Sequence, residues 1–341
     1  VAIGATTLSS GKVRVYRREE SGGNPTYVQM GSTVIGYFGF AYSYSYFGND
    51  LALSGDGKRF AAGAVRVPVG TYVGQVRVFD WNEADDAWSQ IGSEINGEAD
   101  QDYFGHSIAM STNGSRIVIG SEKHNIGGNW DVGRVYVYDW DVSSNDWMLI
   151  GGAIDGDATN DKFGTSVSIS SDGSRIAVGA SGSGGAGRVR LFEYNSNGIT
   201  PVWTPIGDDI GGQSGTDTGS IVSLAGSGTR LSIGGNDIVR IYDLDETSSE
   251  WIKRGADIQS EQINVAYSAI AVSQDGSRVA IGAPSHSGEH SRSGKVSVFR
   301  IACDSIERVV GNECTPCPAG STNQAGDNPS GSDTTCVAAN S

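Results

Sequence analysis

The sequence of 341 residues predicts an all-β fold: a six-bladed β-propeller of four-stranded antiparallel blades, followed by a small disulfide-rich tail. Two observations carry this prediction. A unit of about 50 residues recurs in five full copies and one partial copy. Each unit divides into four short runs, and three of these alternate apolar and polar residues as strands do. Four strands per repeat are typical of a propeller blade. A seven-bladed ring is the alternative if the native protein starts before Val1.

Each strand of the unit has its own signature. The first run opens with Phe-Gly, as at Phe47, Phe104 and Phe163, and the second contains a Gly-Ala pair, as in RIAVGA. The third resembles GRVYVYDW, and the fourth is a brief WxxIG. Asp-Gly or Asn-Gly separates the first two runs and favours a tight hairpin, because both residues tolerate positive φ. We expect the Phe side chains to pack between blades and the Trp side chains to pack outward over the neighbouring hairpin.

The first and last copies are irregular. Residues 1–5, 12–17 and 27–31 supply the second, third and outer strands of the first blade, which lacks its inner Phe-Gly strand. A strand from the chain's own end would close the ring, whereas a strand from a neighbouring molecule would give head-to-tail assembly. In the last copy, Ser305–Val310 is the candidate for the outer strand.

Composition excludes several classes of function. The net charge of −15, with no basic run, argues against nucleic-acid binding. No stretch approaches the roughly 20 apolar residues that span a bilayer. His286 and His290 match the H-x-x-E-H zinc-protease pattern, but they lie in a Ser/Gly loop rather than on a helix, so we interpret the match as chance. We therefore predict that the chain is not an enzyme. Because it begins at Val1, we interpret it as a processed chain or a fragment.

The four cysteines all lie in the tail. They are Cys303, Cys314, Cys317 and Cys336, and residues 1–302 contain none. Clustered cysteines in an even number indicate disulfides and an oxidising compartment. The sequence thus divides into a propeller, 1–302, and a disulfide-bonded module, 303–341, of a secreted or cell-surface protein. Zinc is the alternative, since C-x-x-C is half of a zinc knuckle, although the tail has no His and no second such pair.

The Phe-Gly run, the hairpin, the Gly-Ala pair and the GxVxVF run together resemble the FG-GAP repeats of integrin α-chain propellers, over about 300 of the 341 residues. The resemblance implies a propeller of the kind found in many secreted or cell-surface proteins. Integrin-type hairpins often carry a D-x-D-x-D-G calcium loop, whereas the hairpins here, such as SSDGSR, have one Asp or none. The tail is similar to the small Cys-rich modules of tumour-necrosis-factor-receptor and ephrin-receptor ectodomains. That similarity implies the pairs Cys303–Cys314 and Cys317–Cys336.

Three further features are candidate sites. Asp155, Asp157 and Asp161 form an oxygen-rich loop that predicts calcium binding, with a solvated acidic loop as the alternative. Asn113 lies in an Asn-Gly-Ser glycosylation sequon on a hairpin turn. An aromatic segment, YFGFAYSYSYF, interrupts the repeat and is either a buried loop or a contact surface. Its candidate interface residues are Tyr37, Phe38, Phe40, Tyr42, Tyr44 and Tyr46.

The sequence therefore predicts a non-catalytic extracellular structural or adhesion protein. One form of this prediction is a self-assembling filament subunit with strand complementation between protomers. The alternative is a carbohydrate-binding, lectin-like propeller. The expected partners are further copies of the chain, or another cell-surface protein or glycan. The sequence predicts no cofactor, with calcium at the Asp155 loop as the alternative.

Overall fold

A computed structural model describes residues 1–6, 10–21, 24–36, 45–67, 72–196, 201–259, 267–287 and 293–301. Beyond these it describes the backbone of four short strands: β26 (Glu307–Val310), β27 (Glu313–Pro316), β28 (Ser321–Thr322) and β29 (Val337–Ala338). The one helical element in the described parts is a 3-10 turn, η1 (Ser183–Gly185). No described helix is long and apolar enough to cross a membrane.

The chain forms a six-bladed β-propeller of antiparallel sheets that follow one another in chain order. Blade 2 consists of β5 (Leu51–Leu53), β6 (Arg59–Ala64), β7 (Gln75–Asn82) and β8 (Ala87–Asn96). Blade 3 consists of β9 (Ser107–Met110), β10 (Arg116–Ser121), β11 (Arg134–Asp141) and an outer strand divided into β12 (Asp146–Leu149) and β13 (Ile154–Asp155). Blade 4 consists of β14 (Phe163–Ile169), β15 (Arg175–Ala180), β16 (Arg188–Asn195), β17 (Val202–Pro205) and β18 (Ile210–Gly211). Blade 5 consists of β19 (Ile221–Leu224), β20 (Arg230–Gly234), β21 (Ile238–Asp245) and β22 (Glu250–Gln259).

The two end blades are incomplete in the described parts of the chain. Blade 1 consists of β1 (Ala2–Ala5), β2 (Lys12–Ser21), β3 (Asn24–Gln29) and β4 (Val34–Ile35). The other edge of β1 pairs with no described strand, which confirms that the first blade lacks its inner strand. Blade 6 consists of β23 (Ala269–Val272), β24 (Arg278–Ala283) and β25 (Lys295–Arg300).

The expected outer strand of blade 6 is wrong. Within Ser305–Val310, β26 pairs with β27 in a separate two-stranded hairpin rather than with β25. The two strands are separated by Gly311 and Asn312, residues that favour tight turns. A local hairpin of this kind closes at less entropic cost than pairing with a distant sheet.

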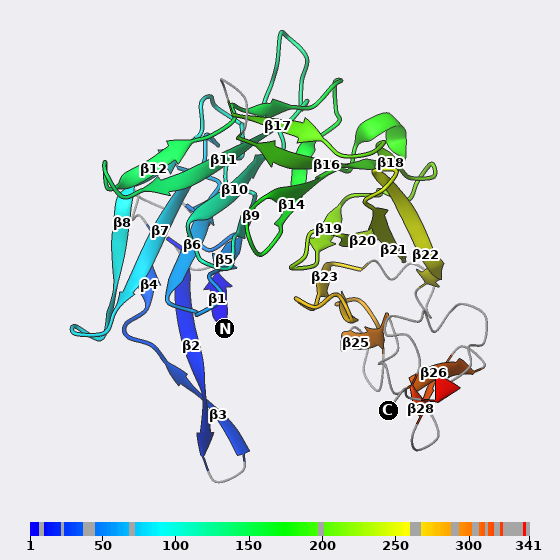
Figure 1. The fold of residues 1–341 in the computed structure, drawn as a ribbon. Helices are drawn as coiled ribbons and strands as arrows, with labels where there is room; N and C mark the ends of the chain where they lie inside the picture. The colour runs from blue at the N-terminus through cyan, green and yellow to red at the C-terminus, as the bar shows by residue number, and fades with distance from the viewer. Residues whose placement is uncertain are drawn as a thin grey trace.

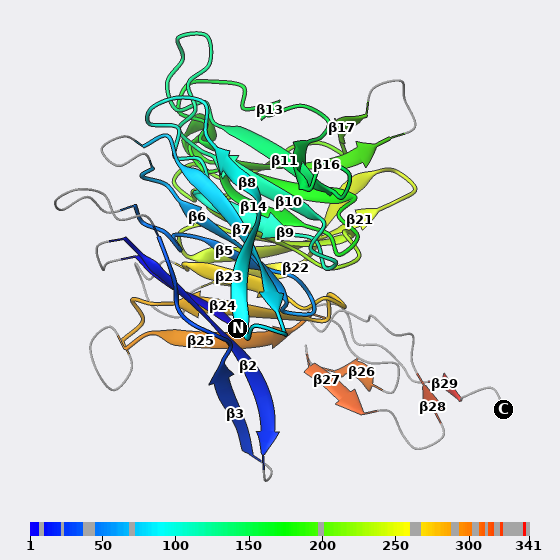
Figure 2. The same ribbon diagram turned by 90° about the vertical axis from the view of Figure 1, so that its left-hand side faces the viewer.

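The blades are arranged in an arc. Figure 1 shows blade 1, in blue, at one end and blade 6, in orange, at the other, with the two ends apart across the opening. Figure 2 shows that β2 and β3 extend as a two-stranded ribbon below the other strands. The inner strands of successive blades contact one another, as do β5 and β9, β9 and β14, and β14 and β19. The arc of blades is therefore continuous from blade 1 to blade 6.

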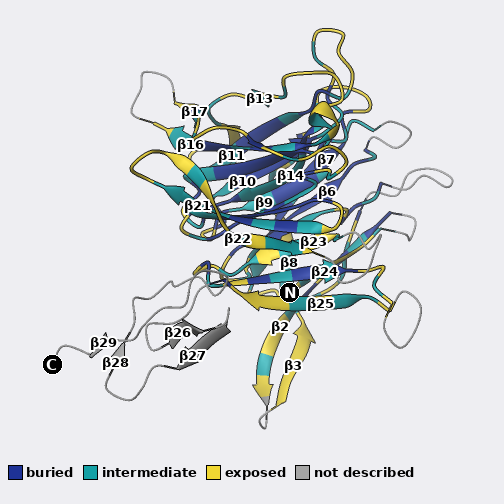
Figure 3. Cartoon of the chain, turned by 90° about the vertical axis from the view of Figure 1, so that its right-hand side faces the viewer, coloured by how far each residue is buried: buried dark blue, intermediate teal, exposed yellow. Residues whose placement is uncertain are grey.

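The hydrophobic core lies between blades. One cluster joins Val76 and Val78 of blade 2 to Phe104, Ile117 and Ile119 of blade 3, all of which are buried. The Phe-Gly aromatics Phe47, Phe104 and Phe163 are at most 1% exposed, as the sequence predicted. Blades 1 to 5 thus bury the alternating apolar residues of their third strands against the second strand of the next blade. Figure 3 shows the buried residues concentrated in the middle blades, while β3 is exposed.

The Trp residues pack differently from the expectation. Trp147 and Trp203 are buried within the clusters between blades, and Trp88 donates a hydrogen bond from Nε1 to the carbonyl of Met30 in the preceding blade. Arg59 of blade 2 stacks over Trp147 of blade 3. The outer strand therefore contributes to the interface with the preceding blade, because the indole ring reaches across it.

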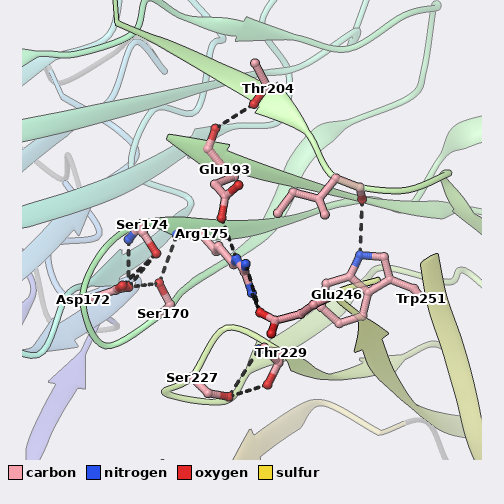
Figure 4. A network of polar contacts seen from close by, with 11 residues as sticks. Ser170, Asp172, Ser174, Arg175, Glu193, Thr204, Ser227, Thr229, Glu246 and Trp251 are labelled. Atoms are coloured by element: carbon pink, nitrogen blue, oxygen red, sulfur yellow. Dashed lines mark hydrogen bonds and ion pairs between the residues drawn. The ribbon is translucent and has the colours of Figure 1, made fainter. Parts of the chain in front are cut away.

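The Asp-Gly hairpins form a second line of contacts between blades. A backbone hydrogen bond joins each hairpin to the next: Gly55 N to Thr112 O (2.8 Å), Thr112 N to Ser171 O (2.9 Å), Ser171 N to Gly226 O (2.9 Å) and Gly226 N to Gln274 O (3.0 Å). The Arg that ends each hairpin also reaches the following blade, as when Arg116 Nη1 donates to Gly173 O. Arg175 reaches Glu246 of blade 5 instead, as Figure 4 shows. The DGSR pattern is thus an inter-blade connector.

Candidate functional site at the end blades

The outward face of blade 6 exposes apolar side chains that the other blades bury. Val296 and Val298 of β25 are 74% and 65% exposed. They occupy the same repeat positions as Val76 and Val78, which are 0% and 1% exposed. The equivalent residues of blades 1 to 5 are at most 7% exposed: Val13, Val15, Val76, Val78, Val135, Val137, Val189, Leu191, Val239 and Ile241. Blade 6 therefore presents a blade-binding face with no described blade against it.

Blade 1 presents the complementary face. Ile3 of β1 is 53% exposed, whereas the equivalent residues of the other blades are at most 3% exposed: Ala62, Ile119, Val178, Ile233 and Ile281. In blades 2 to 6 these residues pack against the preceding blade. The outward faces of the two end blades are thus the two halves of the interface that repeats inside the molecule.

Two glycines in each of blades 1 to 4 admit the segment that precedes the inner strand of the next blade, which is Phe-Gly in blades 2 to 4 and Thr-Gly in blade 5. A Cβ at Gly63 would overlap the carbonyl oxygen of Gly105, and a Cβ at Gly74 would overlap that of Phe104. The same relation holds at Gly4 and Gly11, at Gly120 and Gly133, and at Gly179 and Gly187. Gly74 and Phe104 also form a parallel bridge between the two blades. These glycines are required because another backbone lies against them.

Blade 6 has the same two glycines, and no backbone from another blade approaches them among the described residues. The nearest atom to a Cβ at Gly294 would be Pro284 O at 3.6 Å, and at Gly282 it would be Ala269 Cβ at 3.5 Å, both within blade 6 itself. Gly294 has φ of 74°, close to the 87° of Gly74. Gly282, Gly294, Lys295 and Val296 line a surface hollow of about 360 Å³, together with Ser268, Ala283, Pro284 and Ser293. We call this hollow the blade 6 socket.

A second hollow lies beside blade 1, where the hairpin of that blade would stand. It has a volume of about 420 Å³ and is lined by Val1, Tyr16, Met30 and the blade 2 hairpin from Leu53 to Lys58. In blades 3 to 6 the hairpin glycine lies against the Arg of the preceding blade, as Gly114 lies against Arg59. The equivalent glycine of blade 2, Gly57, meets only Leu53 of its own blade.

The predicted calcium loop is engaged by arginines. Asp155 accepts hydrogen bonds from Arg134, and Asp157 and Asp161 both accept from Arg188. Asp161 is buried and also accepts from the backbone N–H groups of Asp157 and Ala158, so it caps its own loop. In the described parts of the chain, no group of three acidic, His or Cys side chains has the arrangement of a metal site. Calcium binding remains a prediction.

A buried His–Asp contact was not foreseen from the sequence. His124 Nδ1 lies 3.0 Å from Asp102 Oδ2, and both residues are buried. Asp102 also accepts from the backbone N–H groups of Glu98 and Ala99, the same arrangement as Asp161 in the next blade. Glu98 in turn accepts from Arg134 at 2.9 Å. Asp102 occupies the same repeat position as Asp161, at which the carboxylate closes its own loop. Its contact with His124 therefore joins this loop to the loop between β10 and β11.

Aromatic residues gather on the loops of blades 2 and 3. Tyr72 and Tyr103 stack with ring centroids 4.8 Å apart, and Arg66 and Lys123 lie over the outer faces of the two rings. Trp130, on the loop between β10 and β11, is 67% exposed. Of the predicted aromatic interface, Tyr46 is half-buried. Tyr37, Phe38, Phe40, Tyr42 and Tyr44 lie outside the described residues.

The predicted modification sites are in part described. Asn113 is exposed on its hairpin, and its Oδ1 accepts hydrogen bonds from Ser111 Oγ and from the backbone N–H and hydroxyl of Ser115. Its glycosylation remains a prediction. Cys303, Cys317 and Cys336 lie outside the described residues, and only the backbone of Cys314 is described, in β27. The proposed disulfides and the identity of the Cys-rich module remain predictions.

The candidate functional residues that the sequence did not single out are Gly282, Gly294, Val296 and Val298. Their signal in the sequence is faint: the last copy keeps the GxVxV pattern although no further copy follows it. His286, the first residue of the H-x-x-E-H match, lies beside β25 at the end of the described segment 267–287, and His290 is outside the described residues.

The solved structures that resemble this chain in fold have low sequence identity to it. A protein of unknown function from Desulfotomaculum acetoxidans is 13% identical with a TM-score of 0.56, over 88% of this chain and 81% of that one. A proposed 6-phosphogluconolactonase from Bacteroides uniformis is 14% identical with a TM-score of 0.59, over 93% and 80% of the two chains. The periplasmic gluconolactonase of Pseudomonas aeruginosa is 14% identical with a TM-score of 0.56, over 98% and 97%. At these identities the similarity concerns the fold alone.

No protein-family model matches the chain. No curated protein sequence matches it either.

Proposed function

We propose that this chain is a non-catalytic structural or adhesive module of the FG-GAP type that works outside the cell and assembles through its two end blades. The observation that carries the proposal is the exposure of Val296 and Val298, at 74% and 65%, where five equivalent blades bury the same positions. Burying apolar surface is the main driving force of association, and exposed apolar patches on a folded protein mark interaction sites.

Head-to-tail docking is the form of assembly that the repeat favours. The outward face of blade 6 has the residue pattern that blades 1 to 5 bury, and the outward face of blade 1 has the pattern that receives it. Docking blade 6 of one copy on blade 1 of the next would therefore extend an interface already present inside each molecule. A contact between two different surfaces repeats into a filament when it does not close on itself.

The test compares sedimentation of the wild-type chain with that of Val296→Asp/Val298→Asp. We expect concentration-dependent association of the wild type and polymers in negative-stain images of native material. The double variant should stay monomeric because it places two charges in the docking face. Val142→Asp is the matched control, since Val142 is 83% exposed on a turn of blade 3 and should leave association unchanged. A wild type that is monomeric at all concentrations contradicts the assembly.

The non-catalytic part of the proposal has its own test. Two of the similar propellers carry gluconolactonase names, so gluconolactone and its 6-phosphate are the substrates to try. We expect no hydrolysis above the rate of the buffer. Turnover that is lost when His124 is replaced by Gln would contradict the non-catalytic proposal. It would place the His124–Asp102 contact at the centre of an active site.

Carbohydrate binding is the second candidate, favoured by the exposed Trp130 and the stacked Tyr72 and Tyr103. Flat aromatic faces of this kind bind the apolar faces of sugars as they bind other apolar groups. A glycan array should then give saturable signals that Trp130→Ala weakens, whereas Val142→Ala leaves them unchanged.

A further inference from the structure

Two lysines without a carboxylate partner lie on adjoining loops of blades 3 and 4. In these blades every described arginine pairs with an acidic residue: Arg116, Arg134, Arg175, Arg188 and Arg190. Lys123, between β10 and β11, and Lys162, directly before β14, have no such partner among the described residues. The two loops are in contact, because Lys162 N donates to Asp131 O at 2.9 Å and Asn160 N donates to Trp130 O.

Lys162 is held in a backbone conformation that glycine would adopt more easily. Its φ is 54°, and at the equivalent position of other blades Tyr46, Tyr103 and Asp217 have φ of 56°, 56° and 46°. A left-handed conformation is unfavourable for a bulky side chain, yet none of these four copies has the glycine that would relieve it. Residues held in this way cluster at binding and catalytic sites. The side chains at this position therefore mark a candidate ligand surface.

Tyr103 orders the second lysine of this surface. Lys123 Nζ lies 4.3 Å from the centroid of the Tyr103 ring, and the other face of that ring stacks on Tyr72. Arg66, at the repeat position of Lys123, covers the outer face of Tyr72. The faces of both tyrosines are thus covered, and the stack presents two positioned cations. A cation over a ring face is stabilised there without being neutralised, so it keeps its charge for a ligand.

Trp130 supplies an aromatic face that is open. Its side chain is 67% exposed. Its loop is closed by two hydrogen bonds between Ile126 and Asn129 across a two-glycine turn, and Asn129 Oδ1 accepts from Thr159 Oγ1 in the neighbouring loop. A rigid exposed indole can pack on the apolar face of a sugar ring with little loss of conformational entropy.

We infer that Lys123, Trp130 and Lys162 bind an acidic polysaccharide, with its anionic groups on the two lysines and a sugar face on the indole. The inference rests on carbohydrate binding, the second candidate function, and names the class of sugar. A polymer fits better than a single sugar, because the binding groups come from loops of two blades. The net charge of −15 repels a polyanion only within a screening length of roughly 10 Å at 0.1 M salt, so local cations decide the contact.

The test measures binding of the full chain to fluorescent galacturonate oligomers and sulfated galactan oligomers. The same oligomers in methyl-esterified and desulfated form are the matched neutral ligands. At least one acidic oligomer should bind saturably and more tightly than its neutral form, and added salt should weaken this binding. Polyglutamate, which has the charge without the sugar, should bind more weakly than the acidic sugar.

The variants use the left-handed position so that folding is not at risk. Lys162→Gly should weaken binding of the acidic oligomer roughly 2- to 5-fold, the effect of one exposed ion pair. The described contacts of Lys162 are made by its backbone, which glycine keeps, so the thermal midpoint should not fall. Asp217→Gly is the matched control, because it changes the same position in blade 5, with φ of 46°, and should bind as the wild type does.

Two further variants separate charge from stacking. Lys123→Gln should weaken binding of the acidic oligomer by a similar factor and leave binding of its neutral form unchanged. Trp130→Ala should weaken binding of both forms, because it removes the stacking face and no charge.

The outcomes distinguish the inference from carbohydrate binding itself. Equal binding of acidic and neutral oligomers overturns the inference and leaves carbohydrate binding in place. Polyglutamate that binds as tightly as the acidic sugar, or Lys162→Gly that binds as tightly as the wild type, also overturns it. If no oligomer binds and a glycan array gives no signal, both fall.

Discussion

The interface between blades 2 and 3 and the outward face of blade 6 are made from the same sequence pattern in opposite surroundings. Gly63, Gly74, Val76 and Val78 of blade 2 lie against a neighbouring blade, and both valines are buried. The equivalent residues of blade 6 are Gly282, Gly294, Val296 and Val298, which line a hollow or are exposed to solvent. The comparison teaches that a repeat encodes an interface but not whether that interface is occupied.

The largest expected difference between the two regions is the effect of a side chain at the second-strand glycine. Gly63→Val should lower the free energy of unfolding by about 3 kcal/mol, because its Cβ would overlap the carbonyl of Gly105 in blade 3. Gly282→Val should change it by less than about 0.5 kcal/mol, as for an ordinary surface substitution. Urea unfolding followed by Trp fluorescence measures both. Equal losses in the two variants would show that blade 6 is covered as blade 2 is.

The interior pattern could be predicted from the sequence for a simple physical reason. The Phe-Gly, Gly-Ala and Val-x-Val runs have a period of two, and that period fixes which side chains point at a neighbouring sheet. Phe104 and Phe163 are accordingly buried where we expected them. The edge of β1 that pairs with no described strand was also predicted from the sequence, because residues 1–5 match the second run of the repeat.

Other features depend on contacts between distant residues. Nothing in WxxIG shows that Trp147 lies under Arg59 of the preceding blade rather than outward. The Asp155 loop has the composition of a calcium site, and only the folded register brings Arg134 to it. His124 lies in the loop between β10 and β11 and Asp102 in the loop before β9, so their contact depends on how two loops distant in sequence fold together. The exposure of Val298 could not be foreseen because its residue pattern is the same as in the interior.

Lowering the pH should destabilise the protein through Asp243 of blade 5. Burial acts to raise the pKa of this carboxyl, but hydrogen bonds from Arg230 and Arg254 outweigh it and hold the pKa below its usual range. An acid whose pKa is lowered by folding contributes stability above its unfolded pKa of about 3.9, and this contribution is lost as the pH falls through the folded value. We expect Asp243→Asn to cost about 1.5–3 kcal/mol at pH 7, the range for hydrogen bonds to charged groups.

The pH series makes the Asp243 prediction specific. The difference in unfolding free energy between the wild type and Asp243→Asn should shrink as the pH is lowered below about 4. A difference that stays constant down to pH 2 would show that the Arg230 and Arg254 contacts carry no linked stability. Blade 6 has Arg300 at the equivalent position, so it has no carboxylate there to titrate.

The smallest expected effect comes from placing in blade 6 the acidic residue that blades 2 to 5 have opposite the hairpin Arg. Asp80, Asp139, Glu193 and Asp243 each face the Arg of the neighbouring strand, whereas in blade 6 Arg300 faces Arg278 across the sheet. Like charges directly opposite are destabilising, and an exposed ion pair contributes about 0.2–1 kcal/mol. Arg300 has contacts of its own, which the substitution removes, so Arg300→Asp should raise the free energy of unfolding by only a few tenths of a kcal/mol.

Arg300→Ala is the control, because it removes the like charge without adding the ion pair. Its free energy of unfolding, measured in urea at low salt, should lie between that of the wild type and that of Arg300→Asp. If Arg300→Asp is no more stable than Arg300→Ala, the ion pair across the strands contributes no stability of its own. The acid of the interior blades would then stabilise them only where the Arg opposite it also contacts the hairpin of the following blade.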